Sequence, residues 1–134
     1  MPITSVRWVT GKQFVGSDSR HHSVVLSGDD PATGVSPSEM LLIALSACTA
    51  YDVVEIMHKK RKPLSHLEII ADGTRDEKAP WPYRTIHLTY RLSGKDLTEK
   101  AVAQAIMLSE QKFCSVAATV RGVAKISTSF EILP

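Results

Sequence analysis

Two cysteines, Cys48 and Cys114, are the residues of this 134-residue chain with the clearest capacity for chemistry. A thiolate is a nucleophile that can be oxidised, whereas a protonated thiol in apolar surroundings packs as a small hydrophobic side chain. The two cysteines stand 66 positions apart, and the sequence alone does not bring them into contact. The two cysteines can therefore be interpreted either as a reactive pair or as two residues of the hydrophobic core.

Two carboxylates on the segment around Cys48 bear on its reactivity. At about 100° per helical residue, Asp52 follows Cys48 on the same face, and a carboxylate one turn away opposes ionisation of a thiol. Glu39 precedes Cys48 by nine residues, which places it on the opposite face and about 13.5 Å away along the axis. For the two to cooperate, either Glu39 comes from a second subunit or the helix breaks between them. The other role open to Glu39 is that of a helix cap.

The composition excludes several classes of protein. Two cysteines are too few for a secreted disulfide scaffold, and the histidines and cysteines show no zinc-ligand spacing, so we expect no metal site. The 16 Lys and Arg residues nearly balance the 14 Asp and Glu residues, and a net charge of +2 gives no reason to expect a nucleic-acid partner.

Two segments bear on the location of the protein. Residues 40–57 are almost continuously apolar, but Asp52 and Glu55 would each cost roughly 2.5–3.5 kcal/mol at the centre of a membrane helix. We therefore expect a buried helix of a soluble protein without a membrane partner. Residues 1–8 lack the apolar segment of a secretory signal. This predicts a cytoplasmic protein, in which a disulfide would be transient.

Start and stop signals set the limits of the helix that carries Cys48. Ser36 can cap it, Pro37 suits the first helical position, and Glu39 completes a capping box. The helix is expected to run to about Arg61, because a basic segment precedes Pro63, which cannot continue a helix.

The remaining segments predict strands and two further helices. Strands are expected within residues 3–27, and an antiparallel hairpin is expected from residues 65–77 and 84–92. A capping box at residues 96–99 opens a helix through Gln111, and a short helix after Phe113 ends near Gly122. Residues 123–133 form the last strand. The order βββ-α-ββ-α(α)-β predicts a single α+β domain over residues 1–134.

Three segments that contain the cysteines resemble the OsmC/Ohr family, and within it the YhfA-like branch. They are residues 34–42 (GVSPSEMLL), 45–54 (LSACTAYDVV) and 113–116 (FCSV). The resemblance covers essentially the whole chain. It implies an OsmC-like fold in an intertwined homodimer, with the long cysteine-bearing helices packed centrally and antiparallel sheets of both chains wrapped outside.

The resemblance also implies a thiol-dependent peroxidase that reduces organic hydroperoxides or hydrogen peroxide in oxidative stress defence. In that chemistry Cys48 is the peroxidatic residue and forms a sulfenic acid. Cys114 is the resolving residue and condenses with it to a disulfide. No cofactor is expected, and an external dithiol or lipoyl-type reductant would close the cycle.

The sequence departs from the peroxidases of the family at two positions. In those proteins a Glu directly follows the Pro at the helix start, whereas here Ser38 does and Glu39 comes next. Those proteins also carry an Arg a few residues before the Gly that closes the third strand. Here residues 24–28 read VVLSG, and the nearest arginine is Arg20, followed by His21 and His22. Arg20 and Glu39 are thus candidates for activating Cys48, and the alternative function is a non-catalytic homodimer that binds a small apolar ligand at the subunit interface.

Overall fold

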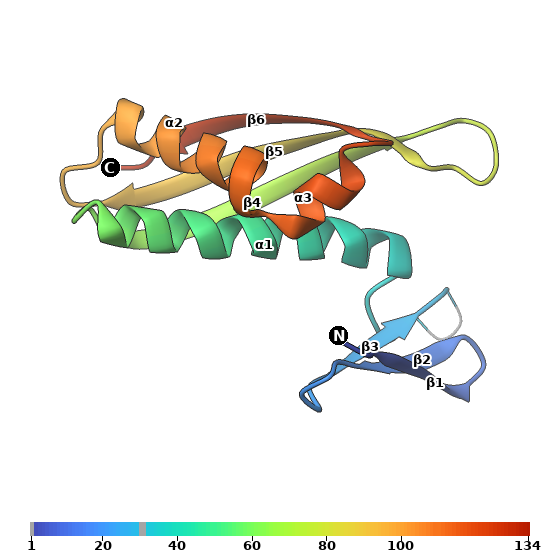
Figure 1. The fold of residues 1–134 in the computed structure, drawn as a ribbon. Helices are drawn as coiled ribbons and strands as arrows, with labels where there is room; N and C mark the ends of the chain where they lie inside the picture. Colours follow the sequence, from blue (N-terminus) through green and yellow to red (C-terminus); the bar gives the residue numbers. More distant parts are fainter. Residues whose placement is uncertain (1, 30–31) are drawn as a thin grey trace. The chain divides into compact units, whose positions relative to one another are not determined.

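The computed structural model describes residues 2–29 and 32–134 (Figure 1). Met1, Asp30 and Pro31 lie outside the described residues, so part of the expected loop between the third strand and the first helix is not described. The chain divides into two compact units, Met1–Leu41 and Leu42–Pro134, which are described separately.

The first unit contains a three-stranded antiparallel sheet, as expected for residues 3–27. Its strands β1 (Ser5–Thr10), β2 (Gln13–Ser17) and β3 (Ser23–Ser27) follow each other in the sheet. Every residue of β1 is exposed, and Trp8 keeps 66% of its surface in solvent. Within the described strands of this unit, only Gly16 and Ser27 are buried. The sheet therefore has almost no apolar core of its own.

Helix α1 (Pro37–Lys59) begins at the predicted residue. The Glu39 amide donates to Ser36 Oγ at 3.4 Å, and that hydroxyl donates to Glu39 Oε2 at 2.9 Å. The helix ends two residues before the predicted Arg61, which adopts a left-handed conformation with φ of 60°. Because α1 is uninterrupted, the alternative in which the helix breaks between Glu39 and Cys48 is wrong.

The second unit contains a sheet in the order β4-β5-β6. Strands β4 (Leu64–Arg75) and β5 (Tyr83–Gly94) form the expected antiparallel hairpin. Strand β6 (Lys125–Ile132) pairs with β5 in parallel, a relationship for which the sequence carried no signal. A parallel pair needs a crossover connection, and here the helices between β5 and β6 provide it.

The crossover consists of three helical segments. They are α2 (Glu99–Leu108), a π-helical turn η1 (Ser109–Phe113) and α3 (Ser115–Val120). The capping box expected at residues 96–99 is wrong in detail, because Thr98 is the N-cap and accepts a hydrogen bond from the Ala101 amide at 3.2 Å. Asp96 instead lies in the preceding turn with φ of 61°. The helical segment expected to reach Gln111 leaves the α conformation at Leu108.

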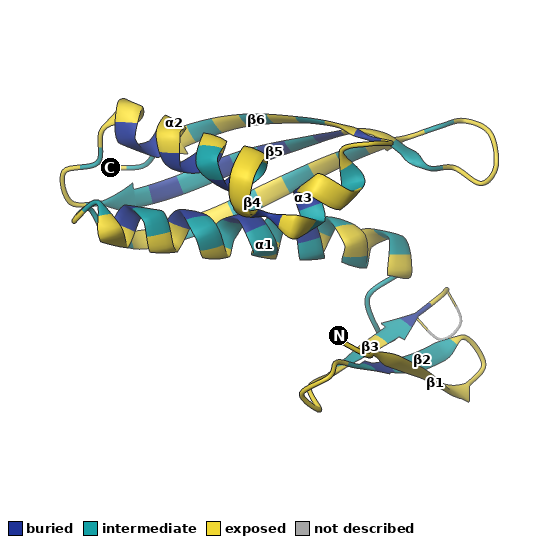
Figure 2. Cartoon of the chain, in the orientation of Figure 1, coloured by how far each residue is buried: buried dark blue, intermediate teal, exposed yellow. Residues whose placement is uncertain are grey.

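The core of the second unit lies between the sheet and its helices (Figures 1 and 2). Buried residues alternate along β5 and recur every fourth position along α1. They are Ile86, Leu88, Tyr90 and Leu92 on the strand, and Leu45, Thr49, Val53 and Met57 on the helix. By length and composition α1 could also cross a bilayer. Its line of buried side chains packs into the core of the second unit, as the sequence predicted.

Candidate functional site

The fold brings Cys48 and Cys114 together. Cys48 lies in the middle of α1, and Cys114 lies between η1 and α3. Both thiols are free, and Cys48 lies near enough to Cys114 to raise the pKa of the Cys114 thiol. Cys114 is 2% exposed, whereas Cys48 is half-buried against the same core. Two residues that sequence spacing could not join are therefore neighbours.

The surroundings of Cys114 favour its protonated thiol. Burial, and to a lesser extent the neighbouring Cys48 thiol, raises the pKa of Cys114 to about 11. The Ala117 amide donates to Cys114 Sγ at 3.3 Å and lowers the pKa, but by less than burial raises it. At neutral pH Cys114 is thus a neutral thiol, held in place by its own helix cap.

Asp52, one turn after Cys48, is engaged by a residue that the sequence analysis missed. Ser109 Oγ donates to Asp52 Oδ2 at 2.8 Å and also lies 3.5 Å from the Thr49 carbonyl oxygen. Ser109 is fully buried, and it follows Ala101 and Ala105 at four-residue intervals. A polar residue that continues an apolar helical stripe is the sequence signal that could have identified it, because buried polar groups need partners.

Tyr90 is a second residue that the sequence analysis missed. Its side chain is fully buried, and its Oη is the only buried side-chain polar atom without a hydrogen-bond partner among the described residues. The Thr49 hydroxyl lies nearby but donates to the Ser46 carbonyl at 3.0 Å. Burial raises the pKa of Tyr90 to about 12, and the Thr49 hydroxyl opposes this shift. Because Tyr90 extends the apolar line of β5, nothing in its sequence position marks it as part of a site.

The two predicted activating residues have local contacts within the first unit. Glu39 takes part in the cap of α1 with Ser36. The exposed Arg20 lies in the turn between β2 and β3, where its amide donates to Asp18 Oδ1 at 2.8 Å. Hydrogen bonds from the His22 amide and ring hold the pKa of Asp18 at about 2. Within residues 2–29 and 32–134, no group of three His, Cys, Asp or Glu side chains could hold a metal ion.

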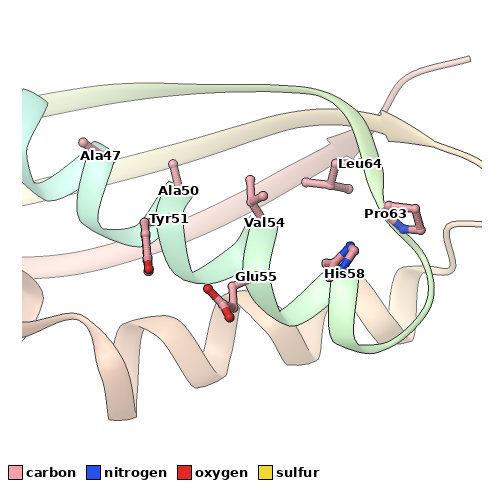
Figure 3. A pocket seen from close by; sticks show the side chains of 8 residues that line it. All are labelled: Ala47, Ala50, Tyr51, Val54, Glu55, His58, Pro63 and Leu64. Carbon is pink, nitrogen blue, oxygen red and sulfur yellow. The ribbon is translucent and has the colours of Figure 1, made fainter.

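A pocket of about 710 Å³ opens along α1 (Figure 3). Its lining is mainly apolar and includes Ala47, the residue before Cys48. Further along the helix it is lined by Ala50, Tyr51, Val54 and His58, and Leu64 closes it from the start of β4. Its size falls within the range of small-molecule sites, which is about 300–1,000 Å³.

The structure is thus an α+β fold in which a cysteine in the middle of α1 lies near a second cysteine at the N-cap of α3. Comparisons with known proteins then give the family. The family model described as "OsmC-like protein" matches residues 28–129, and the chain belongs to this family.

Individual relatives agree with this assignment. Protein YhfA of Escherichia coli is 36% identical over 128 residues, which cover 96% of each chain. A crystal structure from Aquifex aeolicus superposes with a TM-score of 0.90 at 30% identity, covering 99% of this chain and 96% of that one. The organic hydroperoxide resistance protein OhrB of Bacillus subtilis has the same fold, with a TM-score of 0.65 at 14% identity and 98% coverage of both chains.

Proposed function

We propose that this protein is a cytoplasmic thiol-dependent peroxidase that reduces organic hydroperoxides or hydrogen peroxide in oxidative stress defence. The observation that carries the proposal is that Cys48 packs against the core that contains Cys114 and lies near enough to raise the pKa of its thiol. The family supports it, because OhrB, which shares the fold, is named for resistance to organic hydroperoxides. A thiol pair in contact is the minimum that a peroxidatic and a resolving residue require.

The reaction divides between the two sulfurs. The Cys48 thiolate attacks the O–O bond, one oxygen is transferred to sulfur, and the alkoxide or hydroxide leaves and takes up a proton. The Cys114 sulfur then attacks the resulting Cys48 sulfenic acid. The S–S bond forms as the S–O bond breaks, and the departing hydroxide takes the thiol proton of Cys114 and leaves as water. An external dithiol or lipoyl-type reductant restores both thiols by exchange and is itself oxidised to a disulfide.

The burial of the two cysteines supports this division of roles. Cys48 is partly open to solvent and is the residue that an incoming peroxide can reach. Cys114 is buried, and its raised pKa keeps it protonated at neutral pH. A buried neutral thiol is a poor nucleophile toward peroxide. Cys114 can attack the Cys48 sulfenic acid because the hydroxide that leaves takes up the Cys114 proton.

Arg20 is the proposed cation that favours the Cys48 thiolate, and Glu39 is proposed to act together with Arg20, because a carboxylate alone would oppose ionisation of the thiol. Because α1 is unbroken, nine helical residues, or about 13.5 Å, separate Glu39 from Cys48 of its own chain. We therefore propose that Glu39 acts on Cys48 of a second copy.

A homodimer is the proposed assembly, and the exposed apolar side chains of the chain support it. On α1, Ile43 is 48% and Tyr51 is 72% exposed, although both lie in an otherwise apolar helix. In the first unit, Trp8 and the rest of β1 are exposed on a sheet that has almost no core. Apolar surface of this extent is typical of surfaces that another chain covers.

Hydroperoxide consumption with a dithiol donor tests the proposed activity. The wild type is expected to consume cumene hydroperoxide catalytically, whereas Cys48→Ser is expected to lose turnover. Cys114→Ser is expected to form the Cys48 sulfenic acid without an intramolecular disulfide. Equal rates for the wild type and Cys48→Ser would reject the proposal.

The second candidate function is binding of a small apolar ligand without turnover. It is favoured by the size and apolar lining of the α1 pocket (Figure 3). A fluorescent apolar probe such as anilinonaphthalene sulfonate should then bind the wild type and bind more weakly to the Val54→Arg variant. The wild type should not consume hydroperoxide. If the wild type both binds the probe and consumes hydroperoxide, the second candidate function is rejected and the peroxidase is retained.

A further inference from the structure

Ser109 connects the segment that carries Cys114 to the helix that carries Cys48. Its hydroxyl donates to Asp52 Oδ2 at 2.8 Å and lies 3.5 Å from the Thr49 carbonyl oxygen. Thr49 directly follows Cys48, and Asp52 lies one helical turn after it. The buried Ser109 side chain therefore contacts the start and the end of the helical turn that follows Cys48.

The backbone of the same residue fixes Cys114. The Cys114 amide donates to the Ser109 carbonyl at 2.8 Å, which is the five-residue hydrogen bond of the π-helical turn η1. On the other side of Cys114, the Ala118 amide donates to the Cys114 carbonyl at 3.1 Å and starts α3. The position of Cys114 relative to α1 thus depends on how Ser109 is held.

We propose that Ser109 and Asp52 are positioning residues that keep the Cys114 sulfur within bonding reach of Cys48. A disulfide forms only when the two Cα atoms lie within about 7 Å and the side chains point toward each other. The Ser109–Asp52 hydrogen bond holds the π-helical turn against α1 and so raises the effective concentration of one thiol toward the other. In catalysis this pair acts on the second, disulfide-forming step, and that part of the inference rests on the proposed peroxidase function.

The first test measures thiol pairing without any peroxide. The wild type and its variants are equilibrated in glutathione redox buffers, and the fraction of the Cys48–Cys114 disulfide is measured by mass spectrometry. Ser109→Ala and Asp52→Ala are expected to lower the effective concentration about tenfold, which raises the reduction potential of the pair by about 30 mV. Asp52→Asn keeps an oxygen that can accept from Ser109 and is expected to stay closer to the wild type.

The second test separates the two steps of the reaction. One equivalent of cumene hydroperoxide is added, and dimedone traps the sulfenic acid on Cys48 at increasing times. The sulfenic acid should form at the wild-type rate in Ser109→Ala, because Ser109 and Cys114 take no part in the proposed first step. Conversion to the disulfide is expected to be about 10- to 100-fold slower, so the dimedone adduct accumulates.

Ser115→Ala is the matched control, because Ser115 is exposed and directly follows Cys114. It is expected to behave as the wild type in both tests. If Ser109→Ala does not fold, the half-buried Asp52→Ala replaces it. The inference would be overturned if Ser109→Ala and Asp52→Ala both had the same reduction potential of the thiol pair and the same rate of disulfide formation as the wild type. A wild type that pairs its thiols in glutathione but does not react with peroxide would reject only the proposed function.

Discussion

The sulfur of Cys114 caps helix α3 by accepting a hydrogen bond from the Ala117 amide at 3.3 Å. A helix N-terminus stabilises negative charge, and this contact favours the thiolate of Cys114. Burial acts in the opposite direction and prevails, so the pKa of Cys114 is about 11. The same thiol is therefore fixed in position and kept protonated at neutral pH.

Selective alkylation is the first expected consequence. At pH 8, three pH units below its pKa, only about one thousandth of Cys114 is thiolate. Iodoacetamide should therefore label Cys48 well before Cys114, as measured by peptide mass spectrometry over time. Cys48→Ala should speed the labelling of Cys114, because it removes the neighbouring thiol that raises the Cys114 pKa. Equal labelling of both cysteines in the wild type would contradict this assignment.

Alkaline pH should destabilise the protein through Cys114. The folded state holds the Cys114 proton more tightly than the unfolded chain does, since its pKa rises from 9.0 to about 11. Its stabilising contribution is thus complete below about pH 9 and is lost as pH rises to about 11. The loss should be on the order of 2 kcal/mol in the free energy of unfolding, measured by urea denaturation. In Cys114→Ala the free energy of unfolding should fall less between pH 9 and 11 than in the wild type. If it falls equally in both proteins, the pKa of Cys114 is not raised.

Replacement of Tyr90 by phenylalanine should leave the protein as stable as the wild type or stabilise it by up to about 1 kcal/mol. The substitution removes a buried hydroxyl that makes no hydrogen bond and keeps the ring in the core. Urea denaturation is the measurement, and Tyr51→Phe is the control because Tyr51 is 72% exposed. A loss of more than 1 kcal/mol in Tyr90→Phe would show that the hydroxyl has a stabilising partner in solution.

Features that depend on neighbouring residues could be predicted from the sequence, and those that depend on distant ones could not. Ser36, Pro37 and Glu39 identify the start of α1 because the capping interactions act within one turn. The contact between Cys48 and Cys114 depends on how the crossover packs on α1, which no local pattern encodes. The hydrogen bond between Ser109 and Asp52 could not be predicted for the same reason, because the two residues lie on different helical segments.

The start of α2 gives a direct test of the one cap that the sequence analysis placed incorrectly. Thr98→Ala removes the oxygen that accepts from the Ala101 amide and should cost about 1 kcal/mol in the free energy of unfolding. Asp96→Asn should have little effect, because asparagine tolerates the left-handed conformation that Asp96 adopts. Thermal and urea unfolding of both variants would measure this difference. A larger loss in Asp96→Asn than in Thr98→Ala would restore Asp96 as the cap.

The proposed homodimer predicts that charge on the exposed apolar face of α1 prevents association. Size-exclusion chromatography with light scattering should give the wild type a mass near twice the 14.7 kDa of one chain. Val54 is 47% exposed on α1, and Val54→Arg should shift the protein toward the mass of one chain, because an arginine in an apolar interface lacks a partner. Ile70→Arg is the matched control, since Ile70 is 49% exposed but lies on β4 and not on α1. A wild type with the mass of one chain would reject the dimer, and it would also remove the proposed route by which Glu39 reaches Cys48 of a second copy.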